Sequence, residues 1–255
     1  MKTVIVKNTV IGEGQPKIII PLMETDDRTL IAELQEIKKG KPDLIEWRAD
    51  QYKHVEDINA VRNMLGNLAA ETGNIPLIFT FRTVNEGGNK PVSHDYYIQL
   101  IKEAIRSPGV DLIDIELFTA GTELKGLIRQ AEENGKYIIC SNHDFRQTPE
   151  KKEIIHRLRK MQKYGAHILK IAVMPENVRD VLTLLDATCT MQEKYAERPL
   201  ITMAMGKAGL ISRLSGEVFG SSCTFGSGKH TSAPGQIPAS ELKDVLEIIH
   251  KHSGK

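Results

Sequence analysis

Short apolar runs alternate along this chain with longer amphipathic segments. Each run is bounded by polar or turn-forming residues and is rich in β-branched side chains, a pattern typical of strands buried on both faces. Each is followed by a segment whose apolar positions recur at helical spacing. We therefore expect strands at 17–22, 44–48, 77–82, 112–116, 137–143, 168–173, 200–205 and, in the last unit, 218–219 with 223–225.

Capping and stop signals delimit the helices between these strands. Asp26 or Asp27 can cap the first helix, and Gly40-Lys41-Pro42 ends it. Gly135 suits a helix end, and Pro149 suits a first helical turn. We expect helices at 27–39, 55–70, 94–106, 122–134, 150–164, 177–193, 211–216 and 241–252.

Strand and helix alternate eight times, at a spacing of about 30 residues that suits one strand–helix unit. Such alternation predicts parallel strands joined by right-handed crossovers. Eight units in 255 residues favour a (β/α)8 TIM barrel, formed as a single domain over residues 1–255. A short β-hairpin, with strands at 3–6 and 10–14 around Asn8-Thr9, is expected within residues 1–15.

A doubly wound open sheet is the alternative fold. It would be supported by a glycine-rich GxGxxG turn after the first strand, where this chain has Pro21-Leu22-Met23-Glu24. The sequence also lacks a P-loop motif and a linker rich in proline and serine. These observations favour the barrel.

Composition excludes several classes of function. The chain is 40% hydrophobic and 26% charged with a net charge of +1, and only 5% of its residues are aromatic. It has no basic block with interleaved aromatics, so nucleic acid is not expected as a partner. No apolar run approaches the ~20 residues of a membrane span, and no signal peptide is evident. The three cysteines show neither metal nor disulfide spacing, which fits a cytoplasmic protein.

Lys170 is the unusual residue of the sixth strand. It interrupts the apolar run 168–173, and a strand buried on both faces offers it no polar side. One interpretation is an edge strand whose lysine reaches solvent. The other is a desolvated amine, which can lose its proton and attack carbonyl carbons.

Further polar residues collect where the predicted strands end, the position of active sites in such barrels. Alternation along each strand predicts that they share the inward face: Glu46, Arg48, Thr80, Arg82, Glu116, Ser141, His143 and Lys170. Each has a simpler interpretation, such as an ion pair between Glu46 and Arg48 or a loop role for His143. Because His143 and Lys170 belong to neighbouring strands, together they offer an imine-forming amine and a proton carrier. A metal site is less favoured, since no second histidine lies at ligand spacing.

These residues fall in longer motifs that resemble type I 3-dehydroquinate dehydratases. The resemblance runs from the first strand to the last helix and is carried by Glu46-Trp47-Arg48-Ala49-Asp50, Phe79-Thr80-Phe81-Arg82, Glu86-Gly87-Gly88, Ser141-Asn142-His143-Asp144-Phe145, Lys170-Ile171-Ala172-Val173-Met174-Pro175, Ile211-Ser212-Arg213, Gly216-Glu217-Val218-Phe219-Gly220-Ser221 and Ser232-Ala233-Pro234-Gly235-Gln236-Ile237. It implies a TIM barrel, usually a homodimer, that converts 3-dehydroquinate to 3-dehydroshikimate in the shikimate pathway. It also implies a lyase without metal or organic cofactor.

The resemblance assigns roles to individual residues. Lys170 would form an imine with the substrate ketone, His143 would move protons, and Glu86 would orient His143. Arg213 would hold the substrate carboxylate, with Ser232 and Gln236 in a closing loop at 226–236. The remaining expected contacts to the substrate are Glu46, Arg48, Arg82, Met203, Met205 and Phe225. Pro21 departs from the family, which commonly has a serine there, so one polar contact is expected to be missing.

Lys170 must be uncharged when it attacks a carbonyl. Burial and the nearby Arg48 and Arg82 disfavour its ammonium form, whereas Glu46 and Glu86 favour it. We expect the first group of effects to prevail near pH 7.

Two other functions remain open from the residues alone. An imine-forming aldolase acting on sugar phosphates predicts a phosphate site in the last two strand–helix loops. A barrel that binds a ligand without turnover predicts neither adduct nor product.

Overall fold

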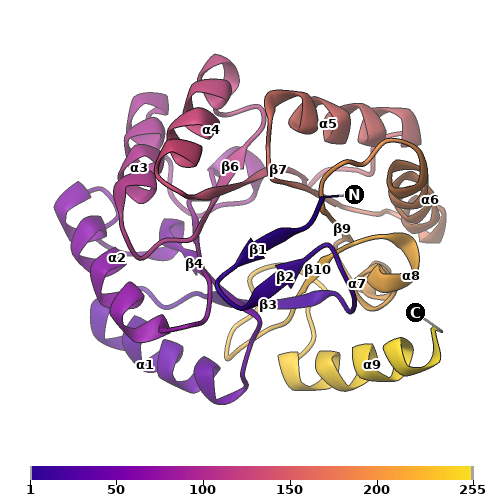
Figure 1. The fold of residues 1–255 in the computed structure, drawn as a ribbon, viewed down its shortest axis with the longest axis horizontal. Helices are drawn as coiled ribbons and strands as arrows, with labels where there is room; N and C mark the ends of the chain where they lie inside the picture. Colours follow the sequence, from indigo (N-terminus) through magenta and orange to yellow (C-terminus); the bar gives the residue numbers. More distant parts are fainter. Residues whose placement is uncertain (1, 254–255) are drawn as a thin grey trace.

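The computed structural model describes residues 2–253 and has a ring of parallel strands surrounded by helices (Figure 1). A two-stranded hairpin of β1 (Val4–Val6) and β2 (Thr9–Ile11) precedes the ring. The strands of the ring are β3 (Lys17–Leu22), β4 (Leu44–Arg48), β5 (Leu77–Thr80), β6 (Leu112–Glu116), β7 (Tyr137–Asp144), β8 (Ile168–Val173), β9 (Leu200–Ala204) and β10 (Cys223–Phe225).

The ring is nearly closed. Each strand pairs in parallel with the next along the chain from β3 to β9, and β10 pairs with β3. Between β9 and β10 the contact narrows to one bridge, Leu200 with Ser221, and the Ser222 N–H donates to the Leu200 carbonyl at 2.7 Å. The TIM barrel with an N-terminal hairpin is therefore confirmed.

Helices cover the outside of the ring, one after each strand except β9, which is followed by two short ones (Figure 1). They are α1 (Asp27–Lys39), α2 (Ile58–Thr72), α3 (His94–Arg106), α4 (Leu124–Glu133), α5 (Lys151–Tyr164), α6 (Val178–Lys194), α7 (Leu210–Leu214), α8 (Gly216–Phe219) and α9 (Ala239–His252), with the 3-10 turns η1 (Ala49–Gln51), η2 (Val84–Glu86) and η3 (Gly121–Glu123). The Asp26 carboxylate caps α1 through the Thr29 N–H at 3.1 Å. None of the helices in residues 2–253 is long and apolar enough to cross a membrane.

Three sequence predictions were wrong in detail. Val218 and Phe219 belong to the single helical turn α8, not to a strand, because Gly220 in the left-handed region (φ 101°) ends that turn before β10 begins. The hairpin turn lies at Lys7-Asn8 rather than Asn8-Thr9, since Val6 already pairs with Thr9. Helix α2 begins at its cap Asp57, later than expected, since that carboxylate accepts the Asn59 N–H.

Side chains alternate between two cores. Along β8, Leu169, Ile171 and Val173 pack outward against the helices, whereas Ile168 and Ala172 pack inside the ring. The hairpin contributes Val4, Val6 and Ile11 to the inner core, where they cover the ends of the strands at which each strand begins. Figure 1 shows the hairpin lying across the ring. The opposite end, at the strand carboxyl ends, is left for the polar residues.

Candidate active site

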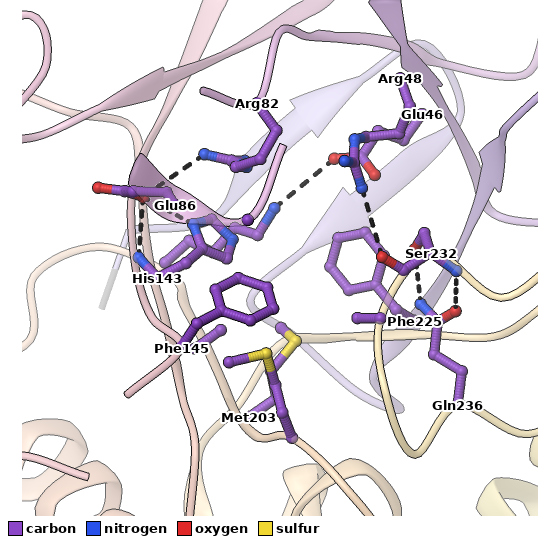
Figure 2. Close-up of a pocket in the computed structure, with 15 residues that line it drawn as sticks. Glu46, Arg48, Arg82, Glu86, His143, Phe145, Met203, Phe225, Ser232 and Gln236 are labelled. Carbon is purple, nitrogen blue, oxygen red and sulfur yellow. Dashed lines mark hydrogen bonds and ion pairs between the residues drawn. The ribbon is translucent and has the colours of Figure 1, made fainter. Parts of the chain in front are cut away.

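A cavity opens at the carboxyl ends of the strands, and most of the residues expected at the site line it (Figure 2). Its lining comes mainly from five strands, β4 and β7 to β10, from the segment after β5 and from the loop before α9. The lining residues are Glu46, Arg48, Arg82, Glu86, Gly87, His143, Phe145, Lys170, Ala172, Met203, Met205, Phe225, Ser232, Ala233 and Gln236.

Lys170 reaches the cavity from the middle of β8, with its side chain only 4% exposed. Because β8 lies between β7 and β9, the edge-strand interpretation is wrong. Its Nζ donates to Asp114 Oδ2 at 2.9 Å and lies 3.6 Å from Glu46 Oε1. The ring of Phe225 is centred 4.7 Å from the same nitrogen. The amine is therefore desolvated, as expected, and two carboxylates lie beside it.

His143 is held by Glu86 through two contacts. Glu86 Oε2 accepts from the His143 backbone N–H at 2.8 Å and lies 2.9 Å from the ring nitrogen Nδ1, while Oε1 accepts from Asn142 at 3.1 Å. With its proton on Nδ1, the imidazole donates to the Glu86 carboxyl group and leaves Nε2 free to accept a proton. The contact with Glu86 thus orients the imidazole for proton transfer through Nε2.

Burial drives both members of this pair toward neutrality. Desolvation and the nearby Glu116 raise the pKa of Glu86 to about 8. Desolvation, together with Arg82 and Lys170, lowers the pKa of His143 well below its usual value. A neutral imidazole near pH 7 can act as a general base.

Arg82 lies at the centre of a buried charge cluster. Its guanidinium donates to Asp114 at 2.8 Å, to Glu116 at 3.0 Å and to Ser141 at 3.0 Å, and it lies 3.7 Å from Glu86. Burial alone would lower the pKa of Arg82, but Asp114 and Glu116 outweigh it and raise that pKa. Most of the donors of Arg82 are therefore used within the protein.

The loop between β10 and α9 closes over the cavity and is fastened by polar contacts. The Ser232 N–H donates to Gln236 Oε1 at 2.7 Å, and Gln236 Nε2 donates to Ser232 Oγ at 2.9 Å. Arg48, paired with Asp50 at 2.8 Å, reaches the Ser232 carbonyl at 3.5 Å (Figure 2). The cavity beneath the loop is about 40 Å³, room for a few water molecules.

Arg213 is buried behind Met203, outside the cavity lining. Its guanidinium donates to the Pro234 carbonyl at 3.1 Å and lies 3.8 Å from the Met203 sulfur. No carboxylate lies within ion-pair distance of it among residues 2–253, and its Nε has no partner there. Burial lowers the pKa of Arg213 to about 10. The arrangement suits an anion supplied from outside the protein.

The comparisons with known proteins agree with one another. The Type I 3-dehydroquinase family model matches residues 18–253. The chain is 57% identical to 3-dehydroquinate dehydratase of Bacillus velezensis over 252 residues, covering 99% of this chain and 100% of the relative. It is 51% identical to the same enzyme of Bacillus subtilis over 253 residues, covering 99% of each.

The chain belongs to the type I 3-dehydroquinate dehydratase family. It is accordingly a hydro-lyase of the shikimate pathway that acts on 3-dehydroquinate.

Solved structures agree with this family assignment. A type I 3-dehydroquinate dehydratase from Clostridium difficile, solved with covalently modified comenic acid, superposes with a TM-score of 0.95 at 49% identity, covering 98% of each chain. The Geobacillus kaustophilus 3-dehydroquinate dehydratase also gives 0.95, at 40% identity, covering 99% of this chain and 98% of its own.

The cavity of this dehydratase brings together all the expected site residues except Arg213. Reasoning from the sequence missed Asp114, the residue that contacts Lys170 most closely, and the wall residues Gly87, Phe145, Ala172 and Ala233. Asp114 stands two positions before Glu116 on the same strand face, so alternation could have found it. Among residues 2–253 no group of three or more histidine, cysteine or acidic side chains could hold a metal ion.

Proposed function

We propose that this enzyme dehydrates 3-dehydroquinate through an imine on Lys170, with His143 as general acid and base. One observation carries the proposal: a desolvated amine and an imidazole fixed by Glu86 line the same small cavity. A structural ion-pair network can also bury a lysine, but it does not require a cavity with a proton carrier beside the amine.

The attack on the ketone requires the uncharged form of the amine. Lys170 Nζ attacks the ketone carbon, a C–N bond forms, and the ketone oxygen leaves as water. The protonated imine then draws electrons from the neighbouring carbon, so His143 Nε2 can remove a proton from it. A C=C bond forms as the hydroxyl departs, protonated by His143, and water finally hydrolyses the imine and restores the lysine.

Arg213 would hold the substrate carboxylate. Its support is the buried guanidinium with no carboxylate partner in the described residues, whose planar fork suits bidentate binding. Ser232 and Gln236, which are hydrogen-bonded to each other in this structure, would bind the same ligand. Arg82, Glu46 and Arg48 would face its hydroxyls, and the apolar walls would be Met203, Met205 and Phe225.

The closing loop must open to admit this substrate. A cavity of about 40 Å³ holds a few water molecules, far less than a six-membered ring with its substituents. Residues 226–236 would therefore move outward for entry and return once the substrate is bound.

Activity and adduct formation test the proposal together. The enzyme is mixed with 3-dehydroquinate, the enone absorbance of the product is followed, and borohydride is added before peptide mapping by mass spectrometry. We expect new absorbance and a reduced adduct on Lys170. An adduct that forms only with a sugar phosphate would support an aldolase. The absence of both signals would support a barrel that binds a ligand without turnover.

Three further expectations remain predictions: a single domain over residues 1–255, a homodimer and a cytoplasmic location. Light scattering of the purified protein tests the homodimer, for which we expect twice the chain mass of 28.5 kDa. A monomer mass would contradict it.

A further inference from the structure

Asp114 is the direct partner of the reactive amine. Its Oδ2 accepts the hydrogen bond from Lys170 Nζ at 2.9 Å, whereas Glu46 lies beyond hydrogen-bond distance at 3.6 Å. Asp114 is 1% exposed and is not among the residues that line the cavity. It therefore reaches the nitrogen from within the barrel, on the side away from a bound ligand.

The position and charge of Asp114 are fixed from the other side. Its Oδ1 accepts from Arg82 at 2.8 Å and from the Ser141 hydroxyl at 2.5 Å. Burial alone would raise the pKa of Asp114, but Arg82 and Lys170 outweigh it and hold that pKa well below its usual value. The carboxylate is thus ionised throughout the pH range in which enzymes of this kind work.

Imine formation conserves the charge on the nitrogen. A lysine ammonium and a ketone give a protonated imine and one water molecule, with a C–N bond formed and the C–O bond broken. The positive charge therefore stays on Nζ before and after the reaction, apart from the moment when the free amine attacks. A fixed anion at hydrogen-bond distance stabilises both states without reorganising.

We propose that Asp114 is the counter-ion that keeps the imine on Lys170 protonated, and so maintains it as an electron sink. This inference rests on the proposed imine mechanism. Glu46 is the less suitable counter-ion, because it lines the cavity, faces the ligand and already accepts from Thr80 at 2.8 Å.

The inference predicts a dependence on pH, so the charged groups around Nζ matter. They come from β4, β6 and β7, from the segment after β5 and from η2, and are Glu46, Arg48, Asp114, His143, Arg82 and Glu86. Within residues 2–253, only Asp114 among these groups accepts a hydrogen bond from Nζ. Its removal should change the protonation of the imine more than removal of any other acid.

The test compares Asp114→Asn with Glu116→Gln, since Glu116 is equally buried and also pairs with Arg82 but has no contact with Lys170. Each protein is incubated with 3-dehydroquinate and cyanoborohydride, which reduces the protonated imine. The adduct on Lys170 is then measured by mass from about pH 6 to about pH 9. Melting temperature, kcat and KM are recorded for each.

For Asp114→Asn we expect the upper pH limit of adduct formation to move down by about 1–3 units, and kcat to fall far more than KM rises. Glu116→Gln should lose comparable thermal stability yet keep the wild-type pH limit. Asp114→Asn with the wild-type pH limit would overturn the inference. Wild-type protein without any adduct would instead overturn the imine mechanism.

If Asp114→Asn does not fold, Ser141→Ala provides a second test. It keeps the carboxylate but removes one of the contacts that fix it. We expect a smaller shift of the pH limit in the same direction, and no shift would count against the counter-ion role.

Discussion

At the scale of single residues, proton transfer depends on which nitrogen of His143 is free. Glu86 occupies Nδ1 at 2.9 Å, so Nε2 is the nitrogen left for the substrate. Replacing His143 by alanine should lower kcat by about 10²–10⁴, the usual range for a lost general acid–base. Steady-state kinetics measure this loss. A decrease below tenfold would show that another group moves the proton.

Glu86 makes stability depend on pH. Because its folded pKa of about 8 lies above its unfolded value near 4.5, the unfolded chain releases this proton first as the pH rises. The native state loses stability from this group between about pH 4.5 and pH 8. Glu86→Gln lacks that loss, so its melting temperature relative to wild type should improve by at least ~4 °C between pH 5 and pH 8. If the difference in melting temperature between the two proteins does not change with pH, Glu86 is ionised over the whole range.

Arg213 should affect binding more than chemistry. Losing a charge-assisted hydrogen bond costs about 1.5–3 kcal/mol, so Arg213→Ala should raise KM by about 10- to 100-fold. Its melting temperature should not fall greatly, because an uncompensated buried cation is removed with the side chain. Kinetics and thermal melting measure the two effects. An unchanged KM would place the substrate carboxylate elsewhere.

At the scale of elements, strand alternation explains why much of the site was predictable. Glu46 and Arg48 lie inside the ring and Trp47 outside it, as period-two alternation requires. Arg213, Ser232 and Gln236 lie in a short helix or a loop, where no periodicity applies, and only the family resemblance located them. The turn α8 was mistaken for a strand because one helical turn is too short to show helical periodicity.

The conformation of the closing loop requires a glycine at position 235. Gly235 has a φ of 81°, and a side chain there would overlap the carbonyl oxygen of Gly206, whose N–H donates to Pro234 at 3.0 Å. Gly235→Ala should lower kcat/KM by about tenfold or more with little change in melting temperature. Gly121→Ala is the matched control, since Gly121 also has positive φ (53°) but no neighbour within 4 Å. Equal kinetics in the two variants would contradict this role of the loop.

At the scale of the whole molecule, stability and chemistry occupy opposite ends of the barrel. The hairpin buries Ile11 completely in the inner core, away from the cavity. Ile11→Ala should cost about 2–4 kcal/mol of unfolding free energy and leave kcat unchanged. Ile5→Ala on the same hairpin is the control, because Ile5 is 58% exposed and should cost little. Denaturant unfolding measures both costs, and a large fall in kcat for Ile11→Ala would show that the two ends are coupled.

The central claim is tested most directly by the intact mass of the enzyme after borohydride reduction with 3-dehydroquinate present. The account predicts one added substrate- or product-derived group per chain, located on Lys170 and absent from Lys170→Ala. A fully active enzyme whose mass does not change, or a group attached to another lysine, would contradict it.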